Sequence, residues 1–258
     1  MIRIQDIAFG YGAEPVLDGV SMRLEKGEFV GVVGPNGSGK TTLLKAMTKV
    51  VRPNRGELQI LDKQISHLSN RELARNIAVV PQDTGVMFAY TVAEIVLMGR
   101  SPYHSALSFD NKDDLVAAQK AMETMDVAHL AQRLLSEISG GERQRVIIAR
   151  ALAQDTPIML LDEPTAFLDL KHQVGIYGVL RRLNREKSMT IIVVSHSLGL
   201  AAQFCKRIVM LKDGRVAADG PVREVMTKAN IERVFEVDVR VDYDEKTGTP
   251  LIFPIAQE

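Results

Sequence analysis

Hydrophobic and polar residues follow two different periods along this chain of 258 residues. Near the N-terminus, apolar and polar side chains alternate, which is the pattern of short antiparallel strands with one buried face. The apolar members of this pattern are Ile2, Ile4, Ile7, Val20, Met22 and Leu24. Further along, the runs FVGVVG, NIAVV, PIMLLDE and TIIVVSH are almost continuously apolar, as in strands buried on both faces.

Helical periodicity separates the last two of these runs and returns after the last one. Strands that alternate with helices are typical of a parallel sheet with helices on its faces. We therefore predict an α/β protein with a mostly parallel core sheet and an antiparallel N-terminal β subdomain.

The segment between NIAVVPQD and PIMLLDE has helical periodicity and no convincing strand. We interpret residues 87–150 as a helical subdomain inserted into a core formed by residues 1–86 and 151–258. In the C-terminal tail, FEVDVRV alternates apolar and charged residues, and Lys246, Thr247 and Gly248 precede a second apolar stretch. This pattern predicts a terminal hairpin.

The chain carries 32 basic and 32 acidic side chains, so no chain-wide basic field is available to hold nucleic acid, and no nucleic-acid partner is expected. Its one cysteine, Cys205, is interpreted as a half-buried apolar residue rather than a reactive thiol. No apolar run approaches the roughly 18–20 residues that span a bilayer, and no charged leader precedes an apolar stretch. We expect the chain to reside in the cytoplasm.

The stretch GPNGSGKTT lies between a predicted buried strand and a predicted helix. Its glycines allow a tight turn whose backbone amides converge on an anion, and the helix N-terminus reinforces that site. Lys40 is placed to neutralise the β- and γ-phosphates, Thr41 to bind Mg²⁺ and Thr42 to contact the α-phosphate. A mere strand-to-helix connection is the competing interpretation. The candidate phosphate-binding residues are Gly34, Pro35, Asn36, Gly37, Ser38, Gly39, Lys40, Thr41 and Thr42.

The strand IMLLDEP ends in two adjacent carboxylates, Asp162 and Glu163. Asp162 fits the acid that holds Mg²⁺ beside a phosphate-binding loop. Glu163 is then available to accept a proton from an attacking water. Two exposed acids at a strand end remain the alternative. Kinases, GTPases, helicases and transport ATPases are all still compatible with these two motifs.

The stretch ISGGERQR, placed between the phosphate loop and LLDEP, resembles the signature of ATP-binding cassette (ABC) ATPases. Other family features follow in the same order: Tyr11, Gln82, FLD at residues 167–169, and His196. The resemblance covers essentially the whole chain. It implies the P-loop fold of ABC ATPases, with ATP and Mg²⁺ as the bound cofactors.

The resemblance also implies roles for single residues. Tyr11 resembles the aromatic residue that stacks on adenine, with simple packing as the alternative. Gln82 resembles the glutamine that senses Mg²⁺ and the attacking water, Asp169 the acid that links two opposed sites, and His196 the histidine that contacts the γ-phosphate. With Glu163, Gln82 and His196 form the candidate catalytic set, and Thr41, Gln82 and Asp162 are the candidate Mg²⁺ ligands.

The signature implies a homodimer. Ser139 and the amides of Gly140 and Gly141 stand at a predicted helix start and form a second anion-binding surface, and Glu142 is a further candidate ATP-binding residue. If this surface faces the γ-phosphate held by another copy, ATP joins two subunits at two composite sites. Two departures from the common family pattern are visible. Glu142 stands where glutamine is usual, which should matter little, and Ser197 replaces an aspartate, which leaves the support of His196 uncertain.

The stretch TVAEIVLMGRSPY, the stretch FLDLKHQ and the tail are similar to the branch of the family that imports iron-siderophores, haem and cobalamin. This resemblance implies a peripheral ATPase on the cytoplasmic face of the cell membrane, bound to a permease dimer and served by an extracytoplasmic binding protein. A groove for the permease is one interpretation of several apolar residues, and core packing is the other: Met87, Phe88, Tyr90, Val92, Ile95, Val96 and Met98. The other candidate functions are an ABC ATPase that acts on nucleic acid and a regulatory module that only binds ATP. The cargo cannot be read from the sequence.

Overall fold

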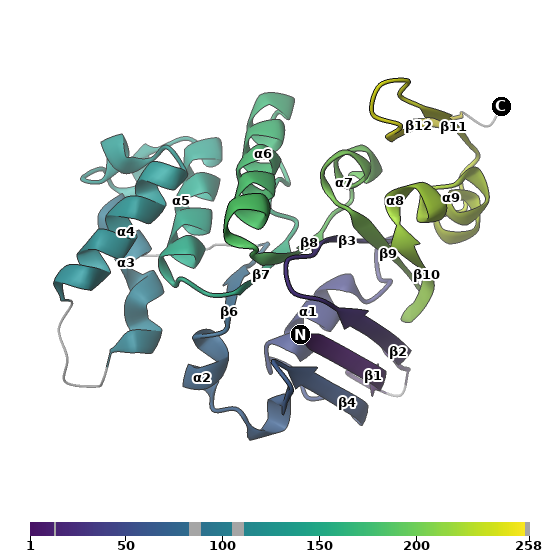
Figure 1. The fold of residues 1–258 in the computed structure, drawn as a ribbon, viewed down its shortest axis with the longest axis horizontal. Helices are drawn as coiled ribbons and strands as arrows, with labels where there is room; N and C mark the ends of the chain where they lie inside the picture. Colours follow the sequence, from purple (N-terminus) through teal and green to yellow (C-terminus); the bar gives the residue numbers. More distant parts are fainter. Residues whose placement is uncertain (13, 83–88, 105–110, 256–258) are drawn as a thin grey trace.

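A six-stranded sheet runs through the middle of the protein, with the strand order β10-β9-β3-β8-β7-β6 (Figure 1). The computed structural model describes residues 1–12, 14–82, 89–104 and 111–255. All neighbouring strands of this sheet are parallel except β9 and β10, so the prediction of a mostly parallel core sheet is confirmed. The strands are β3 (Phe29–Val33), β6 (Ile77–Val80), β7 (Ile158–Asp162), β8 (Thr190–Val194), β9 (Arg207–Lys212) and β10 (Arg215–Pro221).

A second sheet is antiparallel, with the order β2-β1-β4-β5, and confirms the predicted N-terminal β subdomain. Its strands are β1 (Ile2–Phe9), β2 (Leu17–Leu24), β4 (Arg55–Ile60) and β5 (Lys63–Gln64). The apolar positions of the alternating pattern in β1 form its buried face, as predicted, because Ile2, Ile4 and Ile7 are buried. The two strands that follow the phosphate-loop helix had no clear sequence signal.

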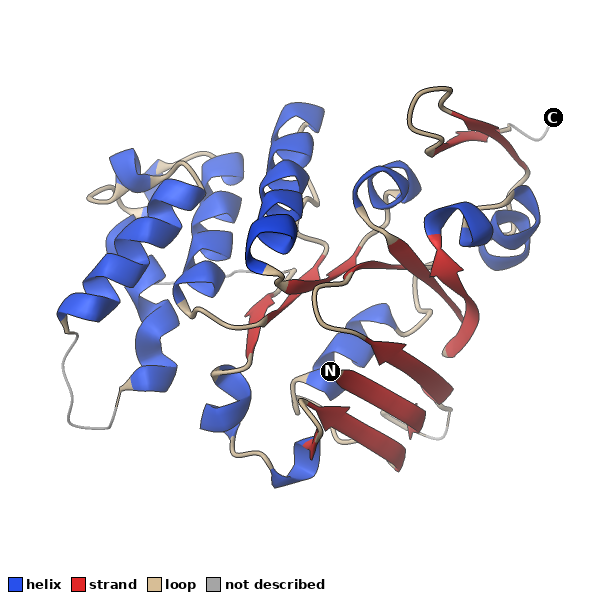
Figure 2. Cartoon of the chain, viewed as in Figure 1, coloured by secondary structure: helices blue, strands red, loops and turns tan. Residues whose placement is uncertain are grey.

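The buried runs of the core sheet divide their side chains between two hydrophobic cores. In β3, Phe29 and Val33 pack in a core on the helical side, whereas Val30 and Val32 pack in a core with the antiparallel sheet. Figure 2 shows helices above the central sheet and the antiparallel sheet below it. Full burial of one such side chain contributes about 1.5–3 kcal/mol. Burial on both faces explains why these runs lack alternation.

Four helices begin with the same local device, a capping box. A Ser, Thr or Asn side chain accepts from the backbone amide three residues later, and an acidic side chain there returns a hydrogen bond. These helices are α2 (Asn70–Ala74), α3 (Val92–Leu97), α4 (Lys112–Thr124) and α5 (Gly140–Ala153). The remaining helices are α1 (Lys40–Met47), α6 (Leu170–Lys187), α7 (Leu198–Phe204), α8 (Val222–Val225) and α9 (Lys228–Phe235).

Helices α3, α4 and α5 pack together beside the β6 edge of the central sheet (Figure 1). Of the two interpretations of this apolar stretch, core packing is confirmed for Val92, Ile95 and Val96, which are buried in the core that α3 shares with these helices. Tyr90 is partly buried against the same core, and Met98 is exposed. Met87 and Phe88 lie outside the described residues.

A buried carboxylate, Asp114, ties the start of α4 to Arg100 and His104. It accepts hydrogen bonds from the Arg100 guanidinium at 2.9 Å, from the Asn111 backbone amide at 3.1 Å and from the His104 ring at 2.9 Å. Burial alone would raise the pKa of Asp114, but these partners hold it below its ordinary value. The aspartate is therefore ionised and compensated within the fold.

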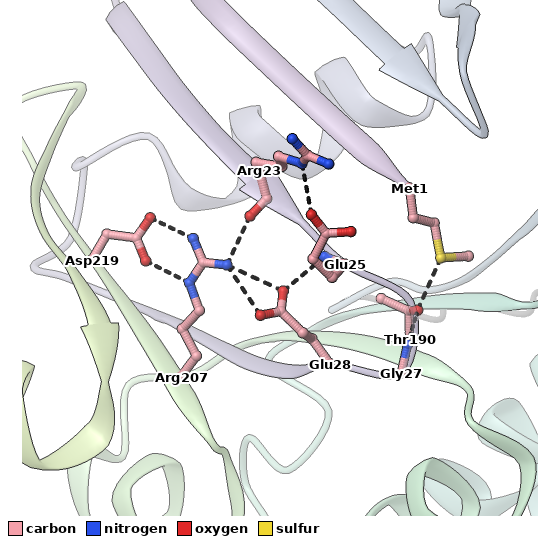
Figure 3. A network of polar contacts seen from close by, with 8 residues as sticks. All are labelled: Met1, Arg23, Glu25, Gly27, Glu28, Thr190, Arg207 and Asp219. Carbon is pink, nitrogen blue, oxygen red and sulfur yellow. Dashed lines mark hydrogen bonds and ion pairs between the residues drawn. The ribbon is translucent and has the colours of Figure 1, made fainter.

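A polar network around Arg207 joins β9 and β10 to the antiparallel sheet (Figure 3). Its guanidinium forms two hydrogen bonds of 2.7 Å with Asp219 and also contacts both oxygens of Glu28. It donates a further bond of 2.7 Å to the carbonyl of Arg23. The planar guanidinium suits such multiple contacts. One side chain therefore connects β9, β10, β2 and the loop that carries Glu28.

The C-terminal tail forms the predicted hairpin, with β11 (Val239–Tyr243) paired to β12 (Pro250–Pro254). The Asp244 carboxylate accepts from the backbone amides of Lys246 and Thr247, and Gly248 has a φ of 64°. The hairpin lies beside α7. Cys205, just after α7, is buried rather than half-buried, and burial raises the pKa of its thiol, as expected of an unreactive cysteine.

Candidate nucleotide-binding and hydrolysis site

The phosphate loop, Glu163 and His196 surround one cavity of about 190 Å³. These groups follow the carboxyl ends of β3, β7 and β8, which are neighbours in the central sheet. In α/β sheets, ligands bind at this edge of the strands. The cavity is lined by Val16, Asn36, Gly37, Gly39, Lys40, Thr41, Thr42, Glu163 and His196.

Glycine is required at two positions of the phosphate loop. Gly39, the N-cap of α1, has a φ of 97°, and an added Cβ would lie 2.8 Å from both Leu17 Cδ2 and the Val16 carbonyl oxygen. A Cβ on Gly34 would lie 2.2 Å from the carbonyl oxygen of Leu211. The loop can therefore lie close against its neighbours only without side chains at these positions. It then leads directly into the N-terminus of α1, where anions are favoured.

Lys40 is buried inside the loop, and its ammonium donates to the carbonyl oxygens of Gly34 at 2.9 Å and Pro35 at 2.8 Å. Burial lowers the pKa of Lys40, whereas the charges of Glu163 and Asp162 oppose that shift. An ammonium has three donors, so one is available to a phosphate oxygen. The buried hydroxyl of Ser38 has no hydrogen-bond partner among the described residues and is a second group for a ligand to satisfy.

Thr41 and Asp162 are two of the three residues predicted to hold Mg²⁺, with Gln82 as the third. The Thr41 hydroxyl lies 3.2 Å from Asp162 Oδ1. Burial raises the pKa of Asp162, the hydrogen bond from Thr41 lowers it, and the neighbouring Glu163 raises it again. A divalent cation would offset this cost of ionising a buried acid. One carboxylate and one hydroxyl, with phosphate oxygens and waters, match the way proteins bind Mg²⁺, so these residues fit the ion.

Glu163 is the point where three predicted catalytic residues meet. The Gln82 side-chain amide donates to Glu163 Oε2 at 3.0 Å, and His196 Nε2 contacts Glu163 Oε1. The Glu163 side chain is largely buried, and its residue has a φ of 48°. This left-handed backbone turns the chain sharply after β7, immediately beyond the strand that carries Asp162. The carboxylate is thereby held at the cavity by partners from two other strand ends.

Ser197 replaces the usual aspartate without leaving the helix start uncapped. Its hydroxyl accepts the backbone amide of Leu200 at 3.3 Å, and its own amide donates to Ser195 Oγ at 3.1 Å. Serine and aspartate are similarly good N-cap residues. In the structure, His196 is supported by its contact with Glu163.

Ser139 is the N-cap of α5, and within this single chain its side chain is hydrogen-bonded to Glu142. Glu142 Oε2 accepts from the Ser139 backbone amide at 2.8 Å and from its hydroxyl at 2.7 Å. These two hydrogen bonds lower the pKa of Glu142, so the signature carries an ionised carboxylate. A phosphate that binds at this helix start has to replace the carboxylate at the Ser139 hydroxyl. Glutamine can form the same capping box through its amide oxygen, so the difference that Glu142 makes at the signature is its negative charge.

Tyr11 lies outside the phosphate cavity and remains 66% exposed. Its ring meets the ring of Phe9 edge to face, with centroids 4.9 Å apart. An exposed aromatic face is suited to stacking on a base. The large exposed fraction argues against a role confined to packing in the core.

The structure does not bring all predicted site residues together within one chain. Ser139, Gly140, Gly141, Glu142 and Asp169 are not among the residues that line the phosphate cavity. The sequence reasoning, for its part, missed Val16 in the cavity wall and His172, whose ring Nδ1 lies 2.8 Å from Asp169 Oδ1. The stretch FLDLKHQ contained the signal for His172, an imidazole three residues after a helix-capping acid.

The sequence model of the ABC transporter family matches residues 17–166. The chain belongs to this family, and with its site it is the ATP-binding and ATP-hydrolysing subunit of a transporter. Within the described residues, none of the helices combines the length and apolarity that crossing a membrane requires.

Similar proteins extend over nearly the whole chain. It is 36% identical to the ferric enterobactin transport ATP-binding protein FepC of Escherichia coli, over 99% of this chain and 94% of that protein. It is 42% identical to the hemin import ATP-binding protein HmuV of Thermobifida fusca, over 95% of this chain and 85% of that protein. Among solved structures, one of an ABC transporter assigned to the metal-chelate type, in an inward-facing conformation, has a TM-score of 0.87 and 28% identity. It covers 99% of this chain and 98% of that chain. A dimeric bacterial ABC transporter cassette has a TM-score of 0.76 and 31% identity, over 86% of this chain and 99% of that chain.

Proposed function

We propose that this chain powers the import of an iron-siderophore, haem, cobalamin or related metal chelate. Similar proteins named for ferric enterobactin, hemin and iron(3+)-hydroxamate support this substrate class. In the proposed complex, two copies bind a membrane permease dimer on its cytoplasmic side. A binding protein outside the membrane delivers the cargo to that permease.

The observation that carries the proposal is the division of the ATP site. The cavity of about 190 Å³ holds the phosphate loop and Glu163, but none of the signature residues. It is smaller than the roughly 300–1,000 Å³ of ordinary ligand pockets, as expected if one chain encloses only the phosphate end of ATP. A second copy with its Ser139 opposite this cavity completes the site. Isologous pairing then produces two composite sites.

The proposed hydrolysis uses the three residues that meet at Glu163. The Glu163 carboxylate accepts a proton from water as the water oxygen bonds to the γ-phosphorus and the bond to ADP breaks. Gln82 and His196 hold that carboxylate and contact the water and the γ-phosphate. When bound, Mg²⁺ neutralises charge on the phosphates, and Thr41, Asp162 and Gln82 would hold it.

ATP binding favours the closed dimer, and hydrolysis returns the population to the open dimer. The helical subdomain, proposed as residues 87–150, carries the signature and follows this closure. Its movement relative to the core of residues 1–86 and 151–258 is what the permease would sense.

Co-purification from membranes tests this proposal. A tagged Glu163→Gln chain is expressed in its native cells, membranes are solubilised with ATP and Mg²⁺, and bound proteins are identified by mass spectrometry. We expect a permease with many membrane helices in equal amount, and its operon or co-purified binding protein would narrow the cargo. The matched control is Glu163→Gln combined with Lys40→Met, which should not lock the closed dimer. Recovery of nucleic acid or soluble partners without a permease would contradict the import function.

The two competing functions have weaker support. A net charge of zero gives no chain-wide attraction to nucleic acid. A module that only binds ATP has no need of the contacts that hold Glu163 to Gln82 and His196. Steady-state phosphate release by the purified chain separates a hydrolytic subunit from such a module.

A further inference from the structure

His172 connects two motifs that lie 30 residues apart in the sequence, the acid at the start of α6 and the signature at the start of α5. On one side, Asp169 Oδ1 accepts from the backbone amide of His172 at 2.9 Å and from its ring Nδ1 at 2.8 Å. Since an ionised carboxylate only accepts hydrogen bonds, Nδ1 carries the proton. The two bonds, the backbone one first, lower the pKa of Asp169. The imidazole therefore fixes the direction of an ionised side chain that is otherwise exposed.

On its other side, the His172 ring lies against Gly141. A Cβ added to Gly141 would lie 2.8 Å from Cδ2 of His172 and 3.1 Å from its Cγ and Nε2. No side chain fits at this position unless the ring moves. A Cβ on Gly140 would meet nothing within 4 Å. Of the two signature glycines, the second is thus the one that makes room for the imidazole within the chain.

We propose that His172 is a positioning residue, which holds Asp169 and the first turn of α5 in one fixed arrangement for the second copy of the chain. The inference rests on the composite-site homodimer proposed above. In that dimer, α5 presents Ser139 to the γ-phosphate of the partner, and Asp169 links the two opposed sites. A preformed arrangement of both groups lowers the cost of closing the dimer.

This role separates His172 from nucleotide binding by a single chain. It does not belong to the lining of the phosphate cavity, which includes Lys40, Thr41 and Glu163. The cap of α6 survives any substitution at position 172 other than proline, because its donor is the backbone amide. Loss of the imidazole should therefore change dimerisation without unfolding α6 or weakening the phosphate loop.

The test measures ATP-dependent dimerisation of the full-length Glu163→Gln chain by size-exclusion chromatography with light scattering. The quantity compared is the ATP concentration, with Mg²⁺, at which half of the chains are dimeric. His172→Ala, Gly141→Ala and the double variant are made in this background. Binding of a fluorescent ATP analogue to dilute, monomeric chains is measured in parallel. Gly175→Ala is the matched control, since this glycine of α6 has open space around its Cβ position and lies outside the site.

We expect His172→Ala to raise the half-dimer ATP concentration about tenfold, with unchanged affinity for the analogue. Gly141→Ala should also impair dimerisation, because the new methyl group displaces the ring. The double variant should be no worse than Gly141→Ala alone, since no ring is left to displace. Gly175→Ala should behave like its parent.

His172→Asn adds a readout that distinguishes the two contacts. Its amide can replace the Nδ1 donor to Asp169, but it lacks the part of the ring that meets Gly141. We expect only partial recovery of dimerisation relative to His172→Ala.

Three results would overturn the inference. The first is His172→Ala dimerising like its parent, and the second is a double variant whose half-dimer ATP concentration is raised by the product of the two single effects. The third is complete recovery of dimerisation in His172→Asn. If these occur while Ser139→Arg still blocks the dimer, the composite-site function stands and only the role of His172 is lost. If the Glu163→Gln parent itself fails to dimerise with ATP, the proposed dimer fails and the inference with it.

Discussion

The side-chain amide of Gln82 donates a hydrogen bond of 3.0 Å to the Glu163 carboxylate, although the two residues are 81 positions apart. The bond joins the loop after β6 to the end of β7. His196, which follows β8, contacts the other carboxylate oxygen. The carboxylate that we propose as the proton acceptor is thus held from both sides by groups from two other strand ends.

Substitution of Glu163 by glutamine should separate ATP binding from hydrolysis. The amide keeps the shape of the side chain but cannot accept a proton from water, so phosphate release should fall about 10²- to 10⁴-fold. ATP affinity should change little. Phosphate release and equilibrium nucleotide binding are measured on the same preparation, and an unchanged turnover would remove Glu163 as the base.

Lys40→Met should weaken ATP binding by roughly 10- to 100-fold, which is the worth of hydrogen bonds from a charged group. Methionine fills nearly the same volume, so the buried site keeps its packing but loses its cation. Isothermal titration calorimetry gives the affinity, and a thermal unfolding curve shows whether the loop remains folded. Undiminished affinity in a folded variant would contradict the assigned role of the phosphate loop.

Tyr11→Ala should weaken ATP binding at least about fivefold, because stacking on a base is worth about 1–3 kcal/mol. The ring is 66% exposed, so the free energy of unfolding should hardly change. Tyr11→Phe is the control, since it keeps an aromatic face. A destabilised Tyr11→Ala protein with normal ATP affinity would instead favour a packing role.

Ser197→Asp should leave ATP hydrolysis within about threefold, because either residue can cap α7 and Glu163 supports His196. Ser197→Ala should lower the free energy of unfolding by about 1 kcal/mol, the usual cost of a lost cap. Chemical denaturation and phosphate release provide the two measurements. A large gain in turnover on introducing aspartate would show that Ser197 limits the contribution of His196 to hydrolysis.

Asp114→Asn should destabilise the protein at neutral pH by roughly 2 kcal/mol, because it weakens hydrogen bonds to a charged group. The folded-state pKa of Asp114 lies below its ordinary value of about 3.9, so its stabilisation is fully present above that pH. This contribution is lost as the pH falls through the folded-state pKa. The stability difference between the two proteins should therefore shrink in acid, as measured by urea denaturation between pH 7 and pH 3. A difference that stays constant over this range would exclude ionisation of Asp114 as its cause.

The identity of the buried strands and of the phosphate loop could be predicted because both depend on local sequence. Strand β3 has to fill two cores, so its residues are apolar throughout, and the loop needs glycine where Leu17 and Leu211 approach its backbone. The order of the motifs was then specific enough to indicate the family. The start of α5 was equally local, as the capping box at Ser139 shows.

The neighbourhood of each motif could not be predicted from local patterns, since it depends on strand order and on which faces meet across space. The strand order places the ends of β6, β7 and β8 side by side, which brings Gln82 and His196 to the same carboxylate. The burial of Val92 and Ile95 against α4 and α5, rather than at a permease groove, was likewise open until the helices were packed. The contact of His172 with Gly141 could not be predicted from the two adjacent signature glycines. They are equivalent in the sequence, and only in the folded chain does the His172 ring fill the space beside one of them.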